Sequence, residues 1–109
     1  MTVSPAVLQG GVLLTTSSVA LYTAPAGTKA VIKRAVFSNY TVAPSTITVT
    51  ITRSGGAALG IITIQPVAAD SSYTAPELAN LVLQTGDVVS AMAANLATVN
   101  AFISGFTVT

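Results

Sequence analysis

The stretch Thr46–Arg53, TITVTITR, decides the fold class of this chain. Its isoleucines and its valine occupy every second position, and threonines occupy the positions between them. Alternation with a period of two places the two kinds of side chain on opposite faces of a strand. The β-branched residues also favour a pleated, half-buried surface. The stretch therefore predicts a β-strand with an apolar inner face and a threonine outer face.

Runs on both sides of this stretch predict further strands. Residues 54–56, SGG, supply a turn, and residues 58–65, ALGIITIQ, form the returning strand of a hairpin. Residues 28–40, TKAVIKRAVFSNY, also alternate, but each face contains apolar side chains and a basic residue. We therefore expect this long strand to be covered on both faces in places, with a bulge or a change of partner near Lys33 and Arg34. The remaining strands are expected in residues 11–16, 18–23, 98–109 and the two halves of 80–93, with a single helical turn beginning at Pro76 and Glu77.

About eight short strands at a spacing of roughly a dozen residues predict an all-β fold. The expected architecture is an antiparallel β-sandwich of the jelly-roll or Greek-key type. A chain of 109 residues forms one domain, residues 1–109, that is large enough to bury a core. The uncharged opening segment, residues 1–11, is either an extended N-terminal arm that adds to a neighbour's sheet edge or the first strand of its own domain.

The charge content is low, with 6% charged and 51% apolar residues and a net charge of +1. An ordinary soluble domain has about 25% charged residues. Uncharged polar side chains solvate a surface without the repulsion that keeps monomers apart. We therefore expect a homo-oligomer or a larger assembly, and the alternative is a monomer with a threonine-rich exterior.

The basic residues are too few for an independent nucleic-acid binder, which needs a clustered basic face. Lys29, Lys33 and Arg34 form a small cluster, and Arg53 stands apart from it. We expect these four residues to make polar contacts with a protein partner. Simple exposure to solvent is the alternative for each.

The uncharged segment 88–109 is long enough to span a bilayer. Its polar residues interrupt any apolar helix surface but fit the alternation of a pair of strands, so no membrane span is expected. No Lys or Arg precedes Lys29, and the positive region of a secretory signal is therefore missing. We expect a protein made in the cytoplasm without an export signal.

The sequence offers little for catalysis. It contains no histidine and no cysteine, which excludes imidazole chemistry, disulfides and thiolate metal sites. The acidic residues are Asp70, Glu77 and Asp87, and both aspartates occupy turn-like contexts in which a carboxylate accepts hydrogen bonds from backbone N–H groups. The glycines in QGG (9–11), SGG (54–56) and TGD (85–87) lack the spacing of a phosphate loop and are predicted to be turns. We expect no enzyme activity, no cofactor and no metal site.

Three Tyr-Thr pairs run into a proline: YTAP at 22–25, YTVAP at 40–44 and YTAP at 73–76. Each tyrosine ends an apolar run, and the proline falls in the connection, where its missing N–H breaks no ladder bond. The two YTAP copies lie nearly half the chain apart, as the two similar halves of a jelly roll would place them. Coincident strand-end residues and an aromatic ligand-binding platform are the other two interpretations.

Three segments together carry a family resemblance: 21–39 (LYTAPAGTKAVIKRAVFSN), 45–56 (STITVTITRSGG) and 81–93 (LVLQTGDVVSAMA). The PAGT turn precedes a strand that ends near an asparagine, and the L-x-x-GD turn precedes the last strands. By these features the chain from Leu21 to about Val108 resembles small all-β virion structural proteins of tailed bacteriophages.

The resemblance implies a capsid decoration or cement protein that binds the shell where capsomers meet. Such a protein is a trimer or a dimer, is located in the virion and contacts the major capsid protein or other virion proteins. Neck, tail-tip and fibre-associated modules look similar. The rival function of another class is a carbohydrate- or receptor-binding module, with Tyr22, Tyr40 and Tyr73 as surfaces on which a sugar stacks.

Overall fold

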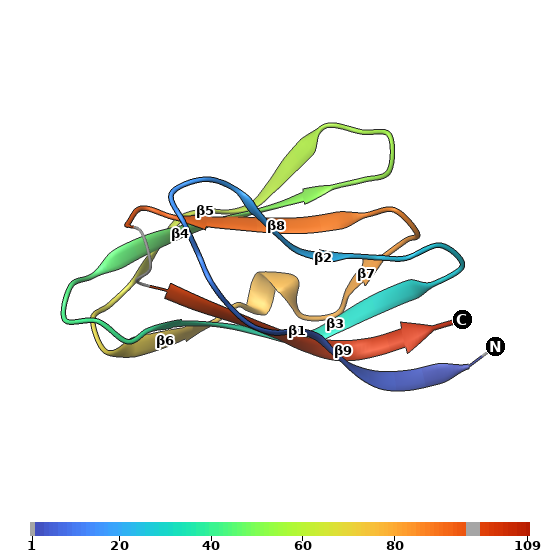
Figure 1. Cartoon of the computed structure of the whole chain (residues 1–109), viewed down its shortest axis with the longest axis horizontal. Coiled ribbons are helices and arrows are strands. Elements are labelled where there is room, and N and C mark those ends of the chain that lie inside the picture. Colours follow the sequence, from blue (N-terminus) through green and yellow to red (C-terminus); the bar gives the residue numbers. More distant parts are fainter. Residues whose placement is uncertain (1, 96–98) are drawn as a thin grey trace.

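The structure is a computed structural model that describes residues 2–95 and 99–109. Two antiparallel sheets pack face to face, with the apolar core between them (Figure 1). The predicted all-β sandwich is confirmed. The elements are β1 (Val3–Leu13), β2 (Val19–Thr23), β3 (Lys29–Asn39), β4 (Ser45–Thr52), β5 (Ala58–Val67), β6 (Ser71–Thr74), the 3-10 turn η1 (Pro76–Leu78), β7 (Leu81–Leu83), β8 (Val88–Ala93) and β9 (Val99–Val108).

The strand order is that of a jelly roll. Sheet A has the order β1-β9-β3-β6, with β7 also pairing with β3, and sheet B has the order β2-β8-β4-β5. The first strand therefore pairs with the last, β2 pairs with β8, and β4 pairs with β5 at the closed end. One long antiparallel ribbon rolled on itself gives this order. Of the two sandwich types predicted, the jelly roll is the one that forms.

The stretch that decides the fold class forms the centre of sheet B. Ile47, Val49 and Ile51 of β4 are buried in the core, and the threonines between them are only partly buried on the outer face. The predicted two-faced strand is confirmed.

Strand β3 contains the predicted irregularity and also changes partner. A bulge interrupts its pairing with β9 between Ile32 and Arg34. On its other edge it pairs first with β7 and then with β6, and η1 fills the gap between these two partners. β6 and β7 thus form one interrupted strand of the roll, and the predicted turn at Pro76 and Glu77 is confirmed as η1.

The bulge explains the mixed pattern that this strand shows in the sequence. Ala30 and Ile32 before it are buried, and so are Ala35 and Phe37 after it, while Lys33 and Arg34 are both exposed. The extra residue shifts the alternation by one position. The strand was expected to be covered on both faces, but it has one buried face. Because the bulge shifts the register, apolar residues fall in both alternating sets.

Two expectations about the N-terminal third are corrected. The residues QGG, 9–11, are not a turn but lie within β1, where its pairing with β9 is irregular. Glycine permits this course, since Gly11 has a φ of +131°, a conformation that side-chain-bearing residues rarely adopt. The first strand begins at Val3 and ends at Leu13, instead of covering the expected residues 11–16. Residues 3–13 pair with β9 of the same chain, which agrees with the alternative that segment 1–11 is the first strand of its own domain.

Two further points concern short segments. Strand β6, SSYT, is not among the strands expected from alternation, because four mostly polar residues carry no alternating signal. Only its end, at the second YTAP copy, was indicated by the sequence. The predicted start of the last strand at Thr98 lies outside the described residues.

The two YTAP copies occupy corresponding places in the roll. β2 and β6 are the second strands of the two halves, and each ends at the threonine of its copy. In both copies the tyrosine is half-buried and the alanine, Ala24 or Ala75, is buried. The prediction that these motifs mark strand ends is confirmed.

Candidate functional site

The four basic residues expected to meet a partner fall into two groups. Lys29, Lys33 and Arg34 lie on β3 and are exposed. The Lys33 ammonium donates a hydrogen bond of 2.7 Å to Asn80 Oδ1. The side chain of Arg34 makes no hydrogen bond or ion pair with any described residue. Arg53 follows β4 in the other sheet and is engaged with Asp87 and Val82, not with the three residues of the cluster.

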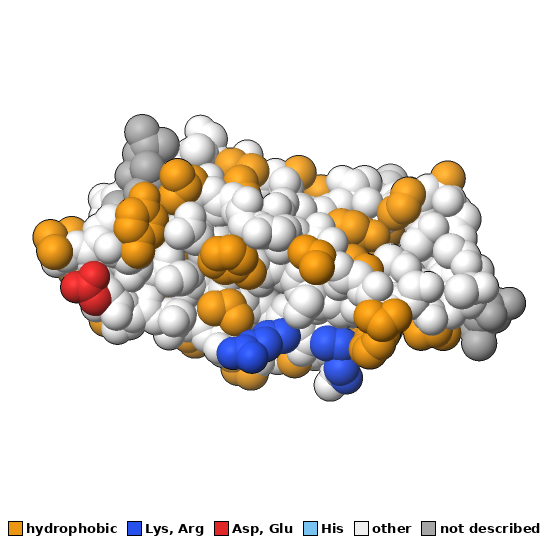
Figure 2. Space-filling model, turned by 60° about the horizontal axis from the view of Figure 1, so that its bottom comes forward, with side chains coloured by type: hydrophobic (Ala, Val, Ile, Leu, Met, Phe, Trp, Pro, Cys, Tyr) orange, Lys and Arg blue, Asp and Glu red, His pale blue; other side chains and the backbone are white. Residues whose placement is uncertain are grey.

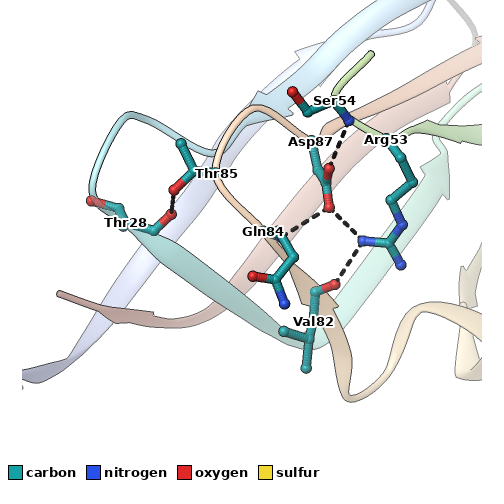
Figure 3. Close-up of polar contacts among 7 residues, drawn as sticks. All are labelled: Thr28, Arg53, Ser54, Val82, Gln84, Thr85 and Asp87. Carbon is teal, nitrogen blue, oxygen red and sulfur yellow. Dashed lines mark hydrogen bonds and ion pairs between the residues drawn. The ribbon is translucent and has the colours of Figure 1, made fainter. Parts of the chain in front are cut away.

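Arg53 is engaged within the chain (Figure 3). Its guanidinium donates a short hydrogen bond to Asp87 Oδ2 and a second one of 3.0 Å to the carbonyl oxygen of Val82. The Asp87 carboxylate also accepts hydrogen bonds from the backbone N–H groups of Ser54 and Gln84, at 3.0 and 2.9 Å. The predicted turn role of Asp87 is confirmed. This network ties the β4–β5 turn of sheet B to β7 of sheet A.

Burial and hydrogen bonding act on the pKa of Asp87 in opposite directions. Its side chain is only 2% exposed, and burial raises the pKa of a carboxyl group. The hydrogen bonds from Arg53, Gln84 and Ser54, together with the Arg53 charge, outweigh burial and lower the pKa of Asp87 below its ordinary value. The charged form is therefore the one built into the fold, and its role is structural.

The outer face of sheet A contains a hollow of about 180 Å³ over β1, β9 and β3. Apolar side chains make up much of its wall, and the Arg34 side chain stands at the same place. Val7 is 75% exposed and Phe102 is 41% exposed, and both side chains line this one hollow. The lining includes Val7, Gln9, Gly10, Arg34, Val36 and Phe102.

Figure 2 shows the molecule from the side of sheet A. Basic side chains are exposed in the lower middle of this face, with hydrophobic side chains beside them, and the acidic side chain visible in this view lies at one far end. The strands of sheet A carry Lys29, Lys33 and Arg34 and contain no acidic residue. The hollow therefore combines exposed apolar surface with positive charge.

The tyrosines do not gather into one aromatic surface. Tyr22 and Tyr73 are half-buried against the core and come from different sheets. The Tyr73 hydroxyl donates to the Glu77 carboxylate, with contacts of 2.7 and 2.9 Å to its two oxygens. Tyr40 follows β3 and is 55% exposed.

Acidic side chains are dispersed as well. Asp70 lies in the turn before β6 with a φ of +53°, which agrees with its predicted turn position. Among residues 2–95 and 99–109 there is no group of three side chains that could hold a metal ion. In the same part of the chain, no helix is long and apolar enough to cross a membrane.

Sequence reasoning missed the hollow and the partner of Asp87. Phe102 lies in the alternating strand β9, VNAFISGFTV, between the buried residues Ala101 and Ile103, so its outward direction was readable from the sequence. Val7 lies in segment 1–11, for which the sequence predicts either an arm or the first strand of the domain. The proximity of Val7 to Phe102 depends on the pairing of β1 with β9 and had no local signal.

Comparisons with known proteins bear on the fold. The sequence matches no protein-family model, and no curated protein matches it. Among solved structures, a chain of infectious bursal disease virus, Gx strain, aligns with a TM-score of 0.52 and 11% identity, over 97% of this chain and 32% of that chain. A chain of the Gt strain aligns over the same shares with a TM-score of 0.49 and 11% identity.

A crystal structure of the infectious bursal disease virus particle aligns with a TM-score of 0.47 and 15% identity, over 97% of this chain and 30% of that chain. The present chain thus spans about a third of the length of these viral chains. At such low identity, the alignment with the Gx strain shows a shared fold.

Proposed function

We propose that this chain is a non-enzymatic structural protein of a virus particle. More narrowly, we propose a capsid decoration or cement protein of a tailed bacteriophage. It would be made in the host cytoplasm and then bound to the assembled shell through the major capsid protein, other virion proteins and further copies of itself, as a trimer or a dimer. Its effect is to stabilise the shell by mass action, because it binds the assembled state.

The observation that carries the proposal is the poverty of ionised groups on the outside of the sandwich. Of the seven charged side chains, Asp87 is buried and Arg53 is paired with it. The strands of sheet B carry no charge at all, and those of sheet A carry three cations on one strand. A surface with so little charge suits a subunit that is covered on several sides by neighbours.

The fold supports the proposal without deciding it. Jelly rolls occur in viral capsid domains and also in lectin domains, and one fold hosts many functions. The likeness to a chain of infectious bursal disease virus lies in the fold. The resemblance of the sequence to small virion proteins of tailed phages points in the same direction.

The proposed assembly has two uses for the N-terminal segment. Residues 3–13 form the edge strand β1 of sheet A, whose outer side has no partner strand within the described residues. We propose that a neighbouring subunit pairs with this edge, or that residues 1–11 exchange with a neighbour as an arm. In either arrangement, residues 1–109 form a single domain.

Purified particles test the function directly. We expect the chain to band with virions in a density gradient, to be identified there by mass spectrometry, and to appear on the capsid in a map of the particle. Particles that lack the chain should release their genome at a lower temperature. A chain that stays in the soluble fraction as a monomer would contradict a virion role, and a location at the neck, tail or fibre would contradict the decoration role only.

A further inference from the structure

The hollow on sheet A combines shape and apolar surface in a way that the fold itself does not require. The side chains of Val7 and Phe102 point away from the core and leave large apolar areas in water. Exposed apolar groups that gather in a concave place are typical of contact sites for another protein. Here they line the same hollow of about 180 Å³, together with Val36.

The shape of the hollow follows from irregular strands on both sides of β9. On one side, the pairing of β1 shifts register twice, between Val7 and Gln9 and again between Gln9 and Val12. On the other side, β3 has its bulge between Ile32 and Arg34. Bulges bend and twist a strand, and Gly10 adds no side chain to fill the space. The outer face is therefore hollowed over β9.

The charge beside the hollow is positive and unopposed. Arg34 lines it and makes no ion pair or hydrogen bond within the described part of the chain. The bulge also leaves Lys33 exposed next to it, and no acidic residue belongs to the strands of sheet A. A guanidinium group in this position favours a carboxylate, which it can hold with two parallel hydrogen bonds.

From this arrangement we propose that the outer face of sheet A is a docking surface for an acidic segment of another virion protein. An apolar side chain of that segment enters the hollow beside Val7 and Phe102, and a neighbouring carboxylate pairs with Arg34. The inference rests on the proposed function insofar as the partner is a virion protein, and it adds which face docks and which chemistry it recognises.

Two other occupants fit the surface less well. A second copy packed face to face would bring Lys33 and Arg34 of both copies together, and like charges at close range oppose such contact. Nucleic acid requires several cations along its backbone, whereas this face offers three and is largely apolar around Arg34. An acidic segment with an apolar anchor satisfies both features of the hollow.

Binding of short labelled peptides tests the proposal without any knowledge of the partner. Three peptides share a central Leu-Phe pair and differ only in their flanks, which are Asp and Glu, Asn and Gln, or Lys and Arg. Fluorescence anisotropy measures their affinity for the full chain. We expect the acidic peptide to bind at least about tenfold more tightly than the neutral one, and the basic peptide to bind most weakly.

Matched variants assign the binding to the hollow. Arg34→Glu and Lys29→Glu change the net charge equally, but only Arg34 lines the hollow. We expect Arg34→Glu to lower the affinity for the acidic peptide about tenfold and Lys29→Glu to lower it less than about threefold. Phe102→Ser should lower the affinity for all three peptides. Met92→Ser, at an exposed position of sheet B, should leave the three affinities unchanged. Circular dichroism verifies that each variant is folded.

Each remaining outcome overturns the proposal. Equal affinity for the three peptides, absence of binding, or equal effects of Arg34→Glu and Lys29→Glu would show that the hollow does not recognise acidic segments. Tighter binding of a single-stranded oligonucleotide, or a change in self-association caused by Arg34→Glu, would assign the face to nucleic acid or to a second copy.

The same variants separate this inference from the proposed function. If Arg34→Glu and Phe102→Ser still band with virions as the unaltered chain does, the docking face is wrong and the virion role stands. If the unaltered chain binds the acidic peptide but never bands with virions, the face is right and the virion role is wrong.

Discussion

The two outer faces of the sandwich come from the same kind of alternating sequence and yet differ in chemistry. On sheet B, the central pair β4–β8 has no register shift, although β2 and β5 pair irregularly with these two strands, and the four threonines of β4 form an uncharged polar row. On sheet A, β1 and β3 are both irregular against β9, and the face carries cations, exposed apolar side chains and a hollow.

The difference shows what a bulge contributes to a surface. Strict alternation places every second side chain on the outside of a strand, so the outer side chains of β4 are its threonines. A bulge places two successive residues, Lys33 and Arg34, on the outside and bends the strand. The regular strand β4 therefore presents a row of threonines, whereas the irregular strands β1 and β3 frame the candidate docking face.

The largest expected effect comes from a glycine that only sheet A requires. A Cβ atom at Gly105 would lie 1.9 Å from the carbonyl oxygen of Val31, a backbone atom of the adjacent strand. Val31 belongs to β3, which is paired with β9 on one edge and with β7 on the other, so this carbonyl group has little room to withdraw. We expect Gly105→Ala to lower the free energy of unfolding by about 3 kcal/mol or more, measured by urea denaturation followed by circular dichroism.

Gly60→Ala in β5 of sheet B is the matched control. The nearest atom to its added Cβ is Thr63 Oγ1 at 3.6 Å, an ordinary contact. Its stability should change by less than about 0.5 kcal/mol. Equal effects of the two substitutions would show that the close approach in sheet A is not a constraint.

The next effect concerns the network that joins the two sheets. Asp87→Asn removes the negative charge of the carboxylate that accepts hydrogen bonds from Arg53 and from two backbone N–H groups. We expect a loss of about 2 kcal/mol, less than for a fully buried pair because water screens the 43% exposed Arg53 side chain. Thermal unfolding at neutral pH measures it, and the glycine variant Gly60→Ala serves again as the folded reference.

The same carboxylate predicts the response to acid. The folded pKa of Asp87 lies below the ordinary value of 3.8, so its contribution to stability is complete above that value and is lost as the pH falls through the folded pKa. Melting temperatures between neutral and strongly acidic pH should therefore fall less in Asp87→Asn than in the unaltered chain. Parallel pH profiles would contradict the assigned direction.

A smaller effect is expected where Gly11 meets Phe102 beneath the hollow. Gly11 has a φ of +131°, and a Cβ there would lie 2.9 Å from the end of the Phe102 ring. We expect Gly11→Ala to cost about 1–2 kcal/mol. Because part of the cost is the contact with the ring, the double variant with Phe102→Ala should lose less than the sum of the single losses, as a double-mutant cycle in urea would measure. Additive losses would assign the whole cost to the backbone.

The smallest effect lies at the end of sheet A, where Tyr73 meets Glu77. Burial, the hydrogen bond to Glu77 and the Glu77 charge together raise the pKa of Tyr73 above its ordinary value of 10.0. Glu77→Gln removes the charge but not the burial, so the pKa of Tyr73 should move only part of the way back. Absorbance titration at alkaline pH measures it, with Tyr73→Phe identifying the signal. An unchanged titration would exclude Glu77 as a cause.

Much of the fold was predictable because its signals are local. The alternation in Thr46–Arg53, the turn residues between strands and the composition all follow from neighbours in the sequence. The irregularity at Lys33 and Arg34 was also readable, since a basic residue on each face of one strand does not suit a regular pleat. Strand β6 and the course of QGG were not readable, because short polar segments and glycines follow the pairing that neighbours impose on them.

The sequence by itself determined that this protein is a charge-poor β-sandwich without histidine or cysteine chemistry, since composition and period-two patterning require no long-range contact. Only the tertiary structure decided that Arg53 belongs to Asp87 and that Arg34 stands beside Val7 and Phe102. The physical reason is that these residues lie far apart in the chain. They meet only when the first strand pairs with the last and the bulges set the register, and no local pattern encodes that combination.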